Sequence, residues 1–290
     1  SGTVFLPNSL TVPQLTISGG TLNSSNTITV SGLLNFAPGT ISGAGDIFAN
    51  GGVNVTGGSV KTLNGHRLIN AATLTWSGGQ LNLGPGSELT NLISGTVDIQ
   101  VNDLLGNPAG SARVGNAGLW KKSAGTGTAQ IDRPFINTGT VNVESGTLTL
   151  SAGGTNFNII TVPSGTALRF QGNYTLAPGS SLTGAGQVIF DSGTIGVDGT
   201  YNITGTNAFI GATVNFIGSY TLDGLHFHLQ SGTVFLPNAL SVPQLTISSG
   251  TLNSSNTITV SGPLNFVGGS LTGAGDIFAA TLFVALQQRR

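Results

Sequence analysis

The chain has 290 residues and a formal net charge of −1, and only 7% of its residues are charged. A composition so poor in Lys and Arg argues against a nucleic-acid partner, which requires clustered positive charge. The chain has no Cys, which excludes disulfides and thiolate metal sites, and no apolar run approaches the ~20 residues that span a bilayer. Glycine is abundant, but 38% of the residues are hydrophobic and recur at alternate positions, so they can line a core that disordered chains lack.

The first predicted elements are short strands near the N-terminus. Residues 18–39 contain three runs of alternating apolar and polar residues, Thr21–Asn23, Thr27–Val30 and Leu33–Phe36, separated by Gly, Ser, Asn and Pro. Such short alternation predicts half-buried strands. Three strands with their turns in about 20 residues predict one coil of a solenoid. We therefore expect an all-β fold, a single-stack parallel β-solenoid (β-helix) with about three short strands and roughly 18–21 residues per coil.

Alternation also predicts which side chains face the core. The residues expected to point inward are Leu10, Val12, Leu15, Ile17, Ile28, Val30, Leu34, Phe36, Val53, Val55, Leu148, Leu150, Leu168, Phe170, Val214 and Phe216. The residues expected to point outward are Thr11, Thr16, Thr29, Asn35, Asn54, Thr149, Arg169 and Asn215.

The chain contains a long internal repeat. Residues 1–49 recur as residues 231–279, with nine differences in 49 positions. We therefore expect a continuous solenoid over residues 1–279, made of one repeat of about 230 residues (1–230) and the start of a second copy (231–279). Residues 280–290 lose the pattern and are expected to form a divergent tail.

Four asparagines recur at coil spacing in the middle of the chain. Asn70, Asn91, Asn116 and Asn137 lie 21, 25 and 21 residues apart, each shortly before a predicted strand. One Asn per coil at the same corner would stack the amides, each donating to the next, as Asn ladders do in cross-β stacks. Asn is also common in turns for local reasons. We favour a structural Asn ladder.

Charged residues concentrate between positions 98 and 133. The segment 102–112 interrupts the strand rhythm there, and a bulged loop with ~4 extra residues is expected. Trp76 is expected in the core, whereas Trp120 could stack on a sugar. Structural ion pairs or a solvated loop are the alternatives to a binding site. The residues of the possible ligand loop are Asp98, Asp103, Arg113, Trp120, Lys121, Lys122, Asp132 and Arg133.

His226 and His228 are weak candidates for a metal site. They alternate with apolar residues in LHFHL, and Asp223 is near in sequence. A divalent site normally needs three or four ligands, and the remaining histidine, His66, is distant. The Asp and Glu residues are scattered, without the close carboxylate pair that glycosidases use. We expect no metal, no cofactor and no catalytic residues.

A resemblance to a known family lies in the long repeat and in the segments SGTLTLSAGG, TLTWSGGQLNL and INTGTVNVESGTLTL. In these features the chain resembles the Gly/Thr/Asn-rich β-solenoids of giant bacterial surface proteins. It is similar to filamentous-haemagglutinin-like adhesins and autotransporter passenger domains. The resemblance covers nearly the whole chain. It implies secretion, an extracellular or cell-surface location, and adhesion or structural display, and it supplies no catalytic residues.

These observations predict a structural protein rather than an enzyme. We expect a component of an extracellular filament, fibre or stalk whose coils stack head to tail with further copies, since uncapped coils expose unpaired backbone groups. The alternative is an adhesin or passenger domain that binds a glycan or host surface. A third possibility is a β-helix enzyme acting on polysaccharides.

Overall fold

The structure is a computed structural model that describes residues 2–106, 110–222 and 224–284. All regular elements in these residues are β-strands. The chain divides into two compact units, Ser1–Ala152 (unit 1) and Gly153–Arg290 (unit 2). No helix long and apolar enough to cross a membrane occurs in the part of the chain that is described.

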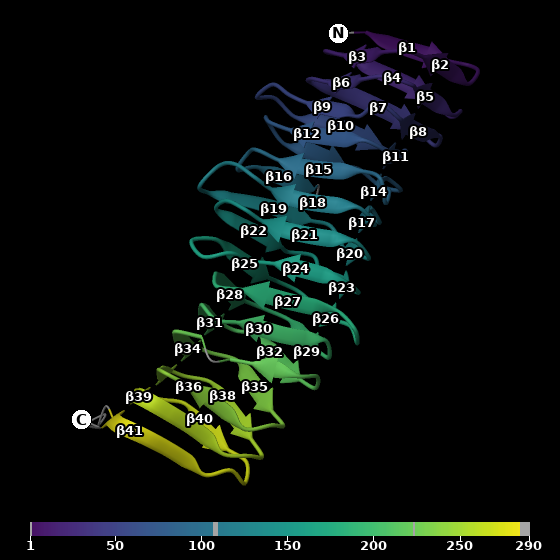
Figure 1. Ribbon diagram of the computed structural model, residues 1–290. Coiled ribbons are helices and arrows are strands. Elements are labelled where there is room, and N and C mark those ends of the chain that lie inside the picture. The colour runs from purple at the N-terminus through teal and green to yellow at the C-terminus, as the bar shows by residue number, and fades with distance from the viewer. Residues whose placement is uncertain (1, 107–109, 223, 285–290) are drawn as a thin grey trace. The chain divides into compact units, whose positions relative to one another are not determined.

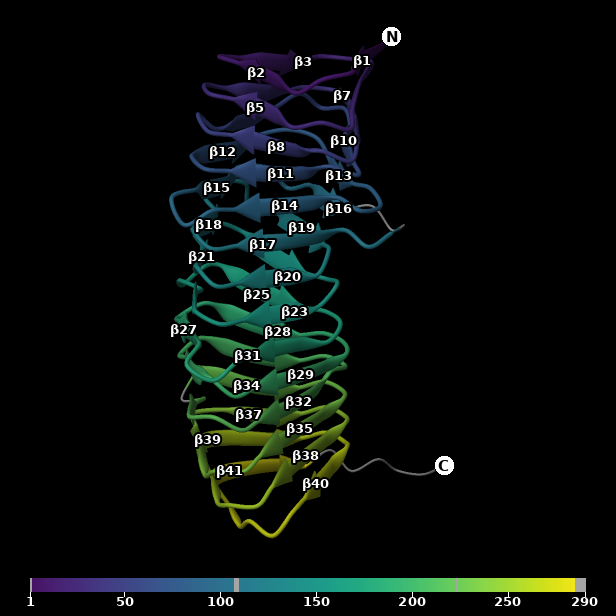
Figure 2. The ribbon, with the colours of Figure 1, turned by 90° about the vertical axis from the view of Figure 1, so that its right-hand side faces the viewer.

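Unit 1 is a stack of three-stranded coils, in which the strands of successive coils pair in parallel to form three sheets (Figure 1). Sheet A contains β1 (Thr3–Leu6), β4 (Thr21–Ser24), β7 (Gly39–Gly43), β10 (Lys61–Asn64), β13 (Leu81–Leu83), β16 (Leu104–Gly106), β19 (Thr128–Asp132) and β22 (Thr147–Leu150). Sheet B, whose strands follow one another as rungs in Figure 2, contains β2 (Leu10–Val12), β5 (Ile28–Val30), β8 (Asp46–Ala49), β11 (Arg67–Asn70), β14 (Glu88–Asn91), β17 (Arg113–Asn116) and β20 (Phe135–Asn137). Sheet C contains β3 (Leu15–Ile17), β6 (Leu34–Phe36), β9 (Val53–Val55), β12 (Thr73–Trp76), β15 (Thr96–Ile99), β18 (Leu119–Lys122) and β21 (Thr140–Val143).

Unit 2 is built in the same way. One sheet contains β25 (Ala167–Phe170), β28 (Gln187–Phe190), β31 (Thr206–Phe209), β34 (His226–Leu229) and β37 (Leu245–Ile247). A second contains β23 (Gly154–Asn156), β26 (Tyr174–Leu176), β29 (Thr194–Val197), β32 (Thr213–Phe216), β35 (Thr233–Leu236), β38 (Thr251–Ser254) and β40 (Ser270–Thr272). A third contains β24 (Ile159–Thr161), β27 (Ser181–Gly184), β30 (Thr200–Ile203) and β33 (Tyr220–Thr221).

The last coils of unit 2 contain two longer strands that continue around a corner. The first residues of β39 (Ile258–Phe266) pair with β36 (Leu240–Val242), and its last residues pair with β37. β41 (Ile277–Val284) then pairs along both parts of β39, with a register irregularity between Val260 and Pro263.

The register confirms the predicted parallel β-solenoid. In unit 1, Thr3 lies opposite Thr21 and Thr21 opposite Thr40, so the coil spacing is that of the sequence pattern. Alternation places apolar side chains inward at every coil, because successive residues of a strand point to opposite faces. In unit 2 the core includes a row of aromatic rings, with ring centroids 5.8 Å apart for Phe170 and Phe190 and 5.0 Å apart for Phe190 and Phe209.

The predicted inner residues are buried, except where no coil lies on one side. Ile28, Val30, Leu34 and Phe36 are completely buried, whereas Leu10, Val12 and Leu15 of the first coil are half-buried. Thr149 departs from the expected exposed outer face, because it is buried as well. It lies opposite Gln130 in the preceding coil, and the Gln130 amide donates to Ser151, two residues after Thr149.

Two segments that were expected to be irregular, residues 102–112 and the tail from residue 280, contain strand residues. Within the expected bulged loop 102–112, β16 pairs with β19, and residues 107–109 lie outside the described residues. The expected tail from residue 280 begins as strand, because Thr281–Val284 pair with Pro263–Phe266. Residues 285–290 also lie outside the described residues.

Candidate functional site

Each coil of unit 1 turns three corners, which we name A–B, B–C and C–A after the sheets that they join. A tight corner leaves backbone carbonyl groups without a partner in the sheet, and a buried carbonyl without a donor is costly. Buried polar side chains supply donors at all three corners. These corner side chains are the candidate functional groups of the unit.

The B–C corner holds the expected Asn row. Asn70, Asn91, Asn116 and Asn137 end successive strands of sheet B in register and are buried. Each Nδ2 group donates to the Oδ1 atom of the next amide, over 2.8 Å from Asn70 to Asn91 and 2.7 Å at the two following steps. Asn70 Oδ1, at the start of the row, is buried and has no donor among the described residues, since Ala49 lies opposite Asn70 in the preceding coil.

The same amides hold the backbone of the corner. Asn91 Nδ2 lies 3.1 Å from both Gly95 O in its own coil and Leu119 O in the next. The chain must pass very close to the amide, because a Cβ atom on Gly95 would lie 2.2 Å from Asn91 Oδ1. The row therefore connects each corner to the next strand and to the next coil.

The A–B corner holds His66 and Arg133. The His66 ring is completely buried, with Nδ1 2.6 Å from Gly45 O and Nε2 3.0 Å from Ser42 O. A carbonyl oxygen can only accept, so any hydrogen bond here is donated by a ring nitrogen. Arg133 is also buried and donates to Leu83 O, with Nη2 at 3.0 Å, while desolvation by burial lowers its pKa.

The C–A corner holds two buried lysines. Lys61 Nζ donates to Gly57 O and Gly78 O, and Lys122 Nζ donates to Ala124 O and Gly125 O at 2.7 Å each and to Asn102 Oδ1 at 3.1 Å. Burial lowers the pKa of both ammonium groups, because desolvation disfavours the charged form. Both amino groups are thus surrounded by corner oxygens rather than available to a ligand.

A row of alternating charges runs along the outer face of sheet B. Asp46, Arg67, Glu88 and Arg113 lie opposite one another in successive coils. Arg67 Nη2 lies 2.7 Å from Asp46 Oδ2, and Arg113 Nη2 lies 2.8 Å from Glu88 Oε2. The arginines are exposed and the carboxylates are half-buried at the surface, so each pair contributes only about 0–1 kcal/mol.

The residues of the possible ligand loop lie on different sheets. Arg113 belongs to the charge row, and Asp132 is the last residue of β19 in sheet A. Asp98 and Lys121 lie on the outer face of sheet C, with Lys121 Nζ 3.6 Å from Asp98 Oδ2. Asp98 also accepts hydrogen bonds from Gln100 and Ser123, Asp103 accepts one from Leu104 N, and Asp132 accepts one from Ser151. The group therefore forms no single surface, and its carboxylates are already paired.

Trp120 and Lys122 point to the core rather than to solvent. Both are completely buried, as is the core residue Trp76. Trp120 packs edge-on against Phe135, with ring centroids 5.1 Å apart. A sugar cannot stack on a buried ring, so the expectation for Trp120 is wrong.

His226 and His228 lie side by side on β34, with their rings stacked and the centroids 5.1 Å apart. Gln230 Nε2 donates to His228 Nδ1, so Nε2 of His228 carries the proton and donates to Ser248 Oγ at 3.2 Å. In this tautomer His228 is not a base for Ser248. Burial lowers the pKa of both rings, and their mutual repulsion lowers that of His226 further. Asp223 lies outside the described residues.

Sequence reasoning missed the buried cations and the charge row, although signals for the charge row and for the two buried lysines were present. The charge row has the same intervals of 21 and 25 residues as the Asn row, three positions earlier in each coil. Lys122 follows Trp120 at the inward alternation of LWKK. Lys61 alternates with the inward residue Leu63 at the start of β10, whereas His66 lies in a turn, where alternation gives no direction.

No family model, curated protein or solved structure matches the chain. Within the described ranges, no three His, Asp or Glu side chains lie close enough to hold a metal ion. What the geometry does show is a set of buried donors that fix the corners of a coil stack.

Proposed function

We propose that this chain is a structural module of an extracellular filament, fibre or stalk, in which β-solenoid coils stack end to end. The supporting observation is that one coil sequence occurs in two surroundings. Residues 2–18 form the first described coil of unit 1, whereas residues 232–248, which differ at two positions, lie between two other coils in unit 2.

The two copies differ in burial at the same side chains. Val4 is 59% exposed, whereas its counterpart Val234 is completely buried. Leu10 and Leu15 are half-buried, whereas Leu240 and Leu245 are buried. Because the sequences match, the difference comes from the coil that covers the second copy. The first coil therefore presents an apolar surface whose shape fits a further coil.

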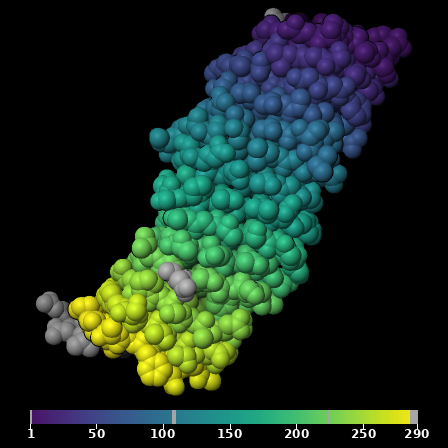
Figure 3. Space-filling view, viewed as in Figure 1, coloured from purple at the N-terminus to yellow at the C-terminus, as the bar shows by residue number. Residues whose placement is uncertain are grey.

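The last described coil also displays core side chains. Leu282 and Val284 of β41 are more than half exposed, and they line a cavity of about 390 Å³ together with Leu264 and Phe266. The surface of these strands is yellow in Figure 3. Parallel pairing at ~4.8 Å per coil would bury these groups and use the free backbone groups of the edge strands. The covering coil can belong to an adjoining repeat of the same polypeptide or to a second copy.

Sedimentation velocity and electron microscopy test this proposal. We expect the chain to associate as its concentration rises, into fibres with a meridional spacing of ~4.8 Å. Val4→Lys places a charge on the inner face of the first coil and should prevent association. Phe5→Lys, on the outer face of the same strand, is the matched control and should associate like the wild type. A wild-type chain that stays monomeric at high concentration contradicts end-to-end stacking of copies.

A second candidate function, adhesion to a neutral glycan, is supported by a different surface. On the outer face of unit 2, Phe235 lies between Asn215 and Asn253 of the neighbouring coils. Phe235 is 38% exposed, and the two amides make no side-chain hydrogen bond to other described residues. The groove around them measures about 360 Å³ and is lined by no charged residue. An aromatic face flanked by free amides suits a pyranose ring.

A glycan-array measurement tests the adhesin candidate. Binding of a neutral oligosaccharide should be lost in Phe235→Ala and kept in Phe5→Ala, which removes the same residue from the first copy of SGTVFLPN. Equal binding by both variants contradicts a site at Phe235.

A further inference from the structure

The corner sequence GAGD occurs at residues 43–46 in unit 1 and at residues 273–276 in unit 2, with different surroundings. In unit 1 the next coil covers the corner and inserts His66 beneath it. Both ring nitrogens then face corner carbonyl oxygens, Gly45 O at 2.6 Å and Ser42 O at 3.0 Å. The corner therefore presents two carbonyl oxygens to the two nitrogens of one imidazole ring.

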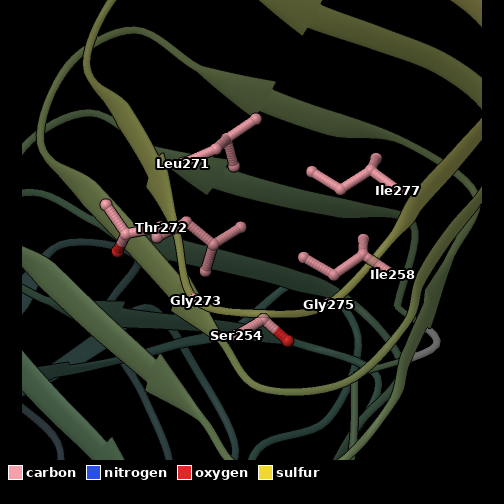
Figure 4. Close-up of a pocket in the computed structure, with 8 residues that line it drawn as sticks. Ser254, Ile258, Leu271, Thr272, Gly273, Gly275 and Ile277 are labelled. Atoms are coloured by element: carbon pink, nitrogen blue, oxygen red, sulfur yellow. The ribbon is translucent and has the colours of Figure 1, made fainter.

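In unit 2 a cavity of about 70 Å³ lies at the corresponding corner, between β40 and β41. Figure 4 shows it between the side chains of Ser254, Ile258, Leu271 and Ile277, with Thr272, Gly273 and Gly275 along its rim. Thr272 and Gly275 correspond to Ser42 and Gly45 in the repeat. No charged side chain lines the cavity.

The two corners share their local geometry. The Asn26 N–H donates to Ser24 Oγ at 3.1 Å, and the Asn256 N–H donates to Ser254 Oγ at 3.4 Å. A Cβ atom on Gly45 would lie 2.1 Å from Asn26 O, and one on Gly275 would lie 2.0 Å from Asn256 O. Glycine is required at both positions by the same close approach of the preceding coil. The corner is thus preserved in the second copy.

The residue after His66 adds a second contact. Arg67 lies opposite Asp46 and pairs with it at 2.7 Å, on the outer side of the same corner. Asp276, the counterpart of Asp46, is exposed and makes no ion pair with the other described residues. One corner therefore accepts a His side chain inside and an Arg side chain outside.

We propose that Thr272–Asp276 is a docking socket for a His-Arg dipeptide carried by a β-coil that stacks on β40 and β41. The imidazole donates to Thr272 O and Gly275 O, and the guanidinium pairs with Asp276. The inference rests on the proposed stacking function and deepens it, because it specifies the partner coil. A coil with a His-Arg step then stacks in a fixed register, whereas a coil without one, such as residues 2–18, stacks without these contacts.

Imidazole itself is the probe for the inner half of the socket. Amide NMR spectra of the chain are recorded with imidazole and with 1,3-dimethylimidazolium, which has the same ring and charge but no N–H donor. We expect imidazole below its pKa to shift the amide signals of residues 271–277 and dimethylimidazolium to leave them unchanged. Equal responses to both compounds, or no response to imidazole, overturn the proposal.

Two variants make the test specific. Leu271→Phe places a ring in the cavity and should abolish the shifts, whereas Asp276→Asn should keep them, because Asp276 contacts only the guanidinium. His66→Gly opens the unit 1 corner and serves as the positive control, since imidazole should raise its urea midpoint. Rescue of His66→Gly with no response at residues 271–277 also overturns the proposed second socket.

The measurement separates this proposal from the stacking function. It is made on Val4→Lys, which is expected to remain monomeric, so imidazole binding is observed without any association of copies. If the wild type associates but Val4→Lys does not bind imidazole, the socket alone is refuted. If Val4→Lys binds imidazole but the wild type stays monomeric, the stacking of copies alone is refuted.

Discussion

At the residue scale, unit 1 is held together by donors aimed at corner carbonyl groups. Buried oxygens at the corners accept hydrogen bonds from the Asn row, His66, Arg133 and the two lysines. A net hydrogen bond contributes about 1 kcal/mol, but a buried group left without its partner costs about 1–3 kcal/mol. Substitutions in these rows should therefore reduce stability far more than substitutions of outer polar residues.

Asn91→Ala tests the amide row. It removes the acceptor of Asn70, the donor to Asn116 Oδ1 and the donor to two backbone carbonyl groups. We expect a loss of about 1–3 kcal/mol in the free energy of unfolding, measured by urea denaturation. Asn142→Ala, on the outer face of β21, is the control and should change stability by less than about 0.5 kcal/mol. Equal losses in the two variants would show that the Asn row contributes nothing to the free energy of unfolding.

The histidine pair makes unit 2 sensitive to acid. The pKa of His226 and of His228 is lowered in the folded state by burial, and for His226 also by the neighbouring ring. The unfolded chain then binds protons more readily, so stability is constant above the unfolded pKa of ~6.5 and falls as the pH drops below it through the folded pKa values. Thermal unfolding across this window checks the trend. The double variant His226→Asn, His228→Asn should show a flatter profile.

At the element scale, the corners constrain the chain more tightly than the strands do. The strands are short and tolerate many polar residues outside, whereas Gly95 lies against Asn91 Oδ1 and Asn70 O. The corner must be this close because the amide of each coil bonds to the backbone of the next. Glycine there is a packing requirement rather than a source of flexibility.

Gly95→Ala and Gly115→Ala form a matched pair of variants in unit 1. A Cβ atom at position 95 would lie 2.2 Å from Asn91 Oδ1, whereas the nearest atom to one at position 115 is Glu88 Oε1 at 3.8 Å. Overpacking of this kind costs about 1–3 kcal/mol. We expect a clear fall in the urea midpoint for Gly95→Ala and almost none for Gly115→Ala. A tolerated Gly95→Ala would mean that the corner relaxes easily.

At the scale of the whole molecule, stability depends on the number of neighbours of each coil. Each coil contacts the coils next to it, so a coil with one neighbour opens more readily than a coil with two. The internal repeat makes this dependence measurable, because the same sequence occurs in both situations.

Hydrogen exchange compares the two copies directly. Backbone amides of residues 3–17 should exchange much faster than those of residues 233–247, although the two segments are nearly identical in sequence. Mass spectrometry of peptic peptides from both segments gives the two rates in one experiment. On formation of fibres, the first segment should become as protected as the second. Equal protection in the monomer would contradict a stability set by neighbouring coils.

The sequence by itself determined the coil period, the inward alternation of Ile28, Val30 and Phe36, the Asn row and the internal repeat, because all of these are periodic properties of the chain. Only the tertiary structure decided where the non-periodic residues lie. His66 and Arg133 are buried because corner carbonyl groups of other coils face them, and Asp98 and Arg113 are separated because their strands belong to different sheets. The exposure of Val4 and the burial of Val234 make the same distinction, since burial is set by the neighbouring coil and not by the local sequence.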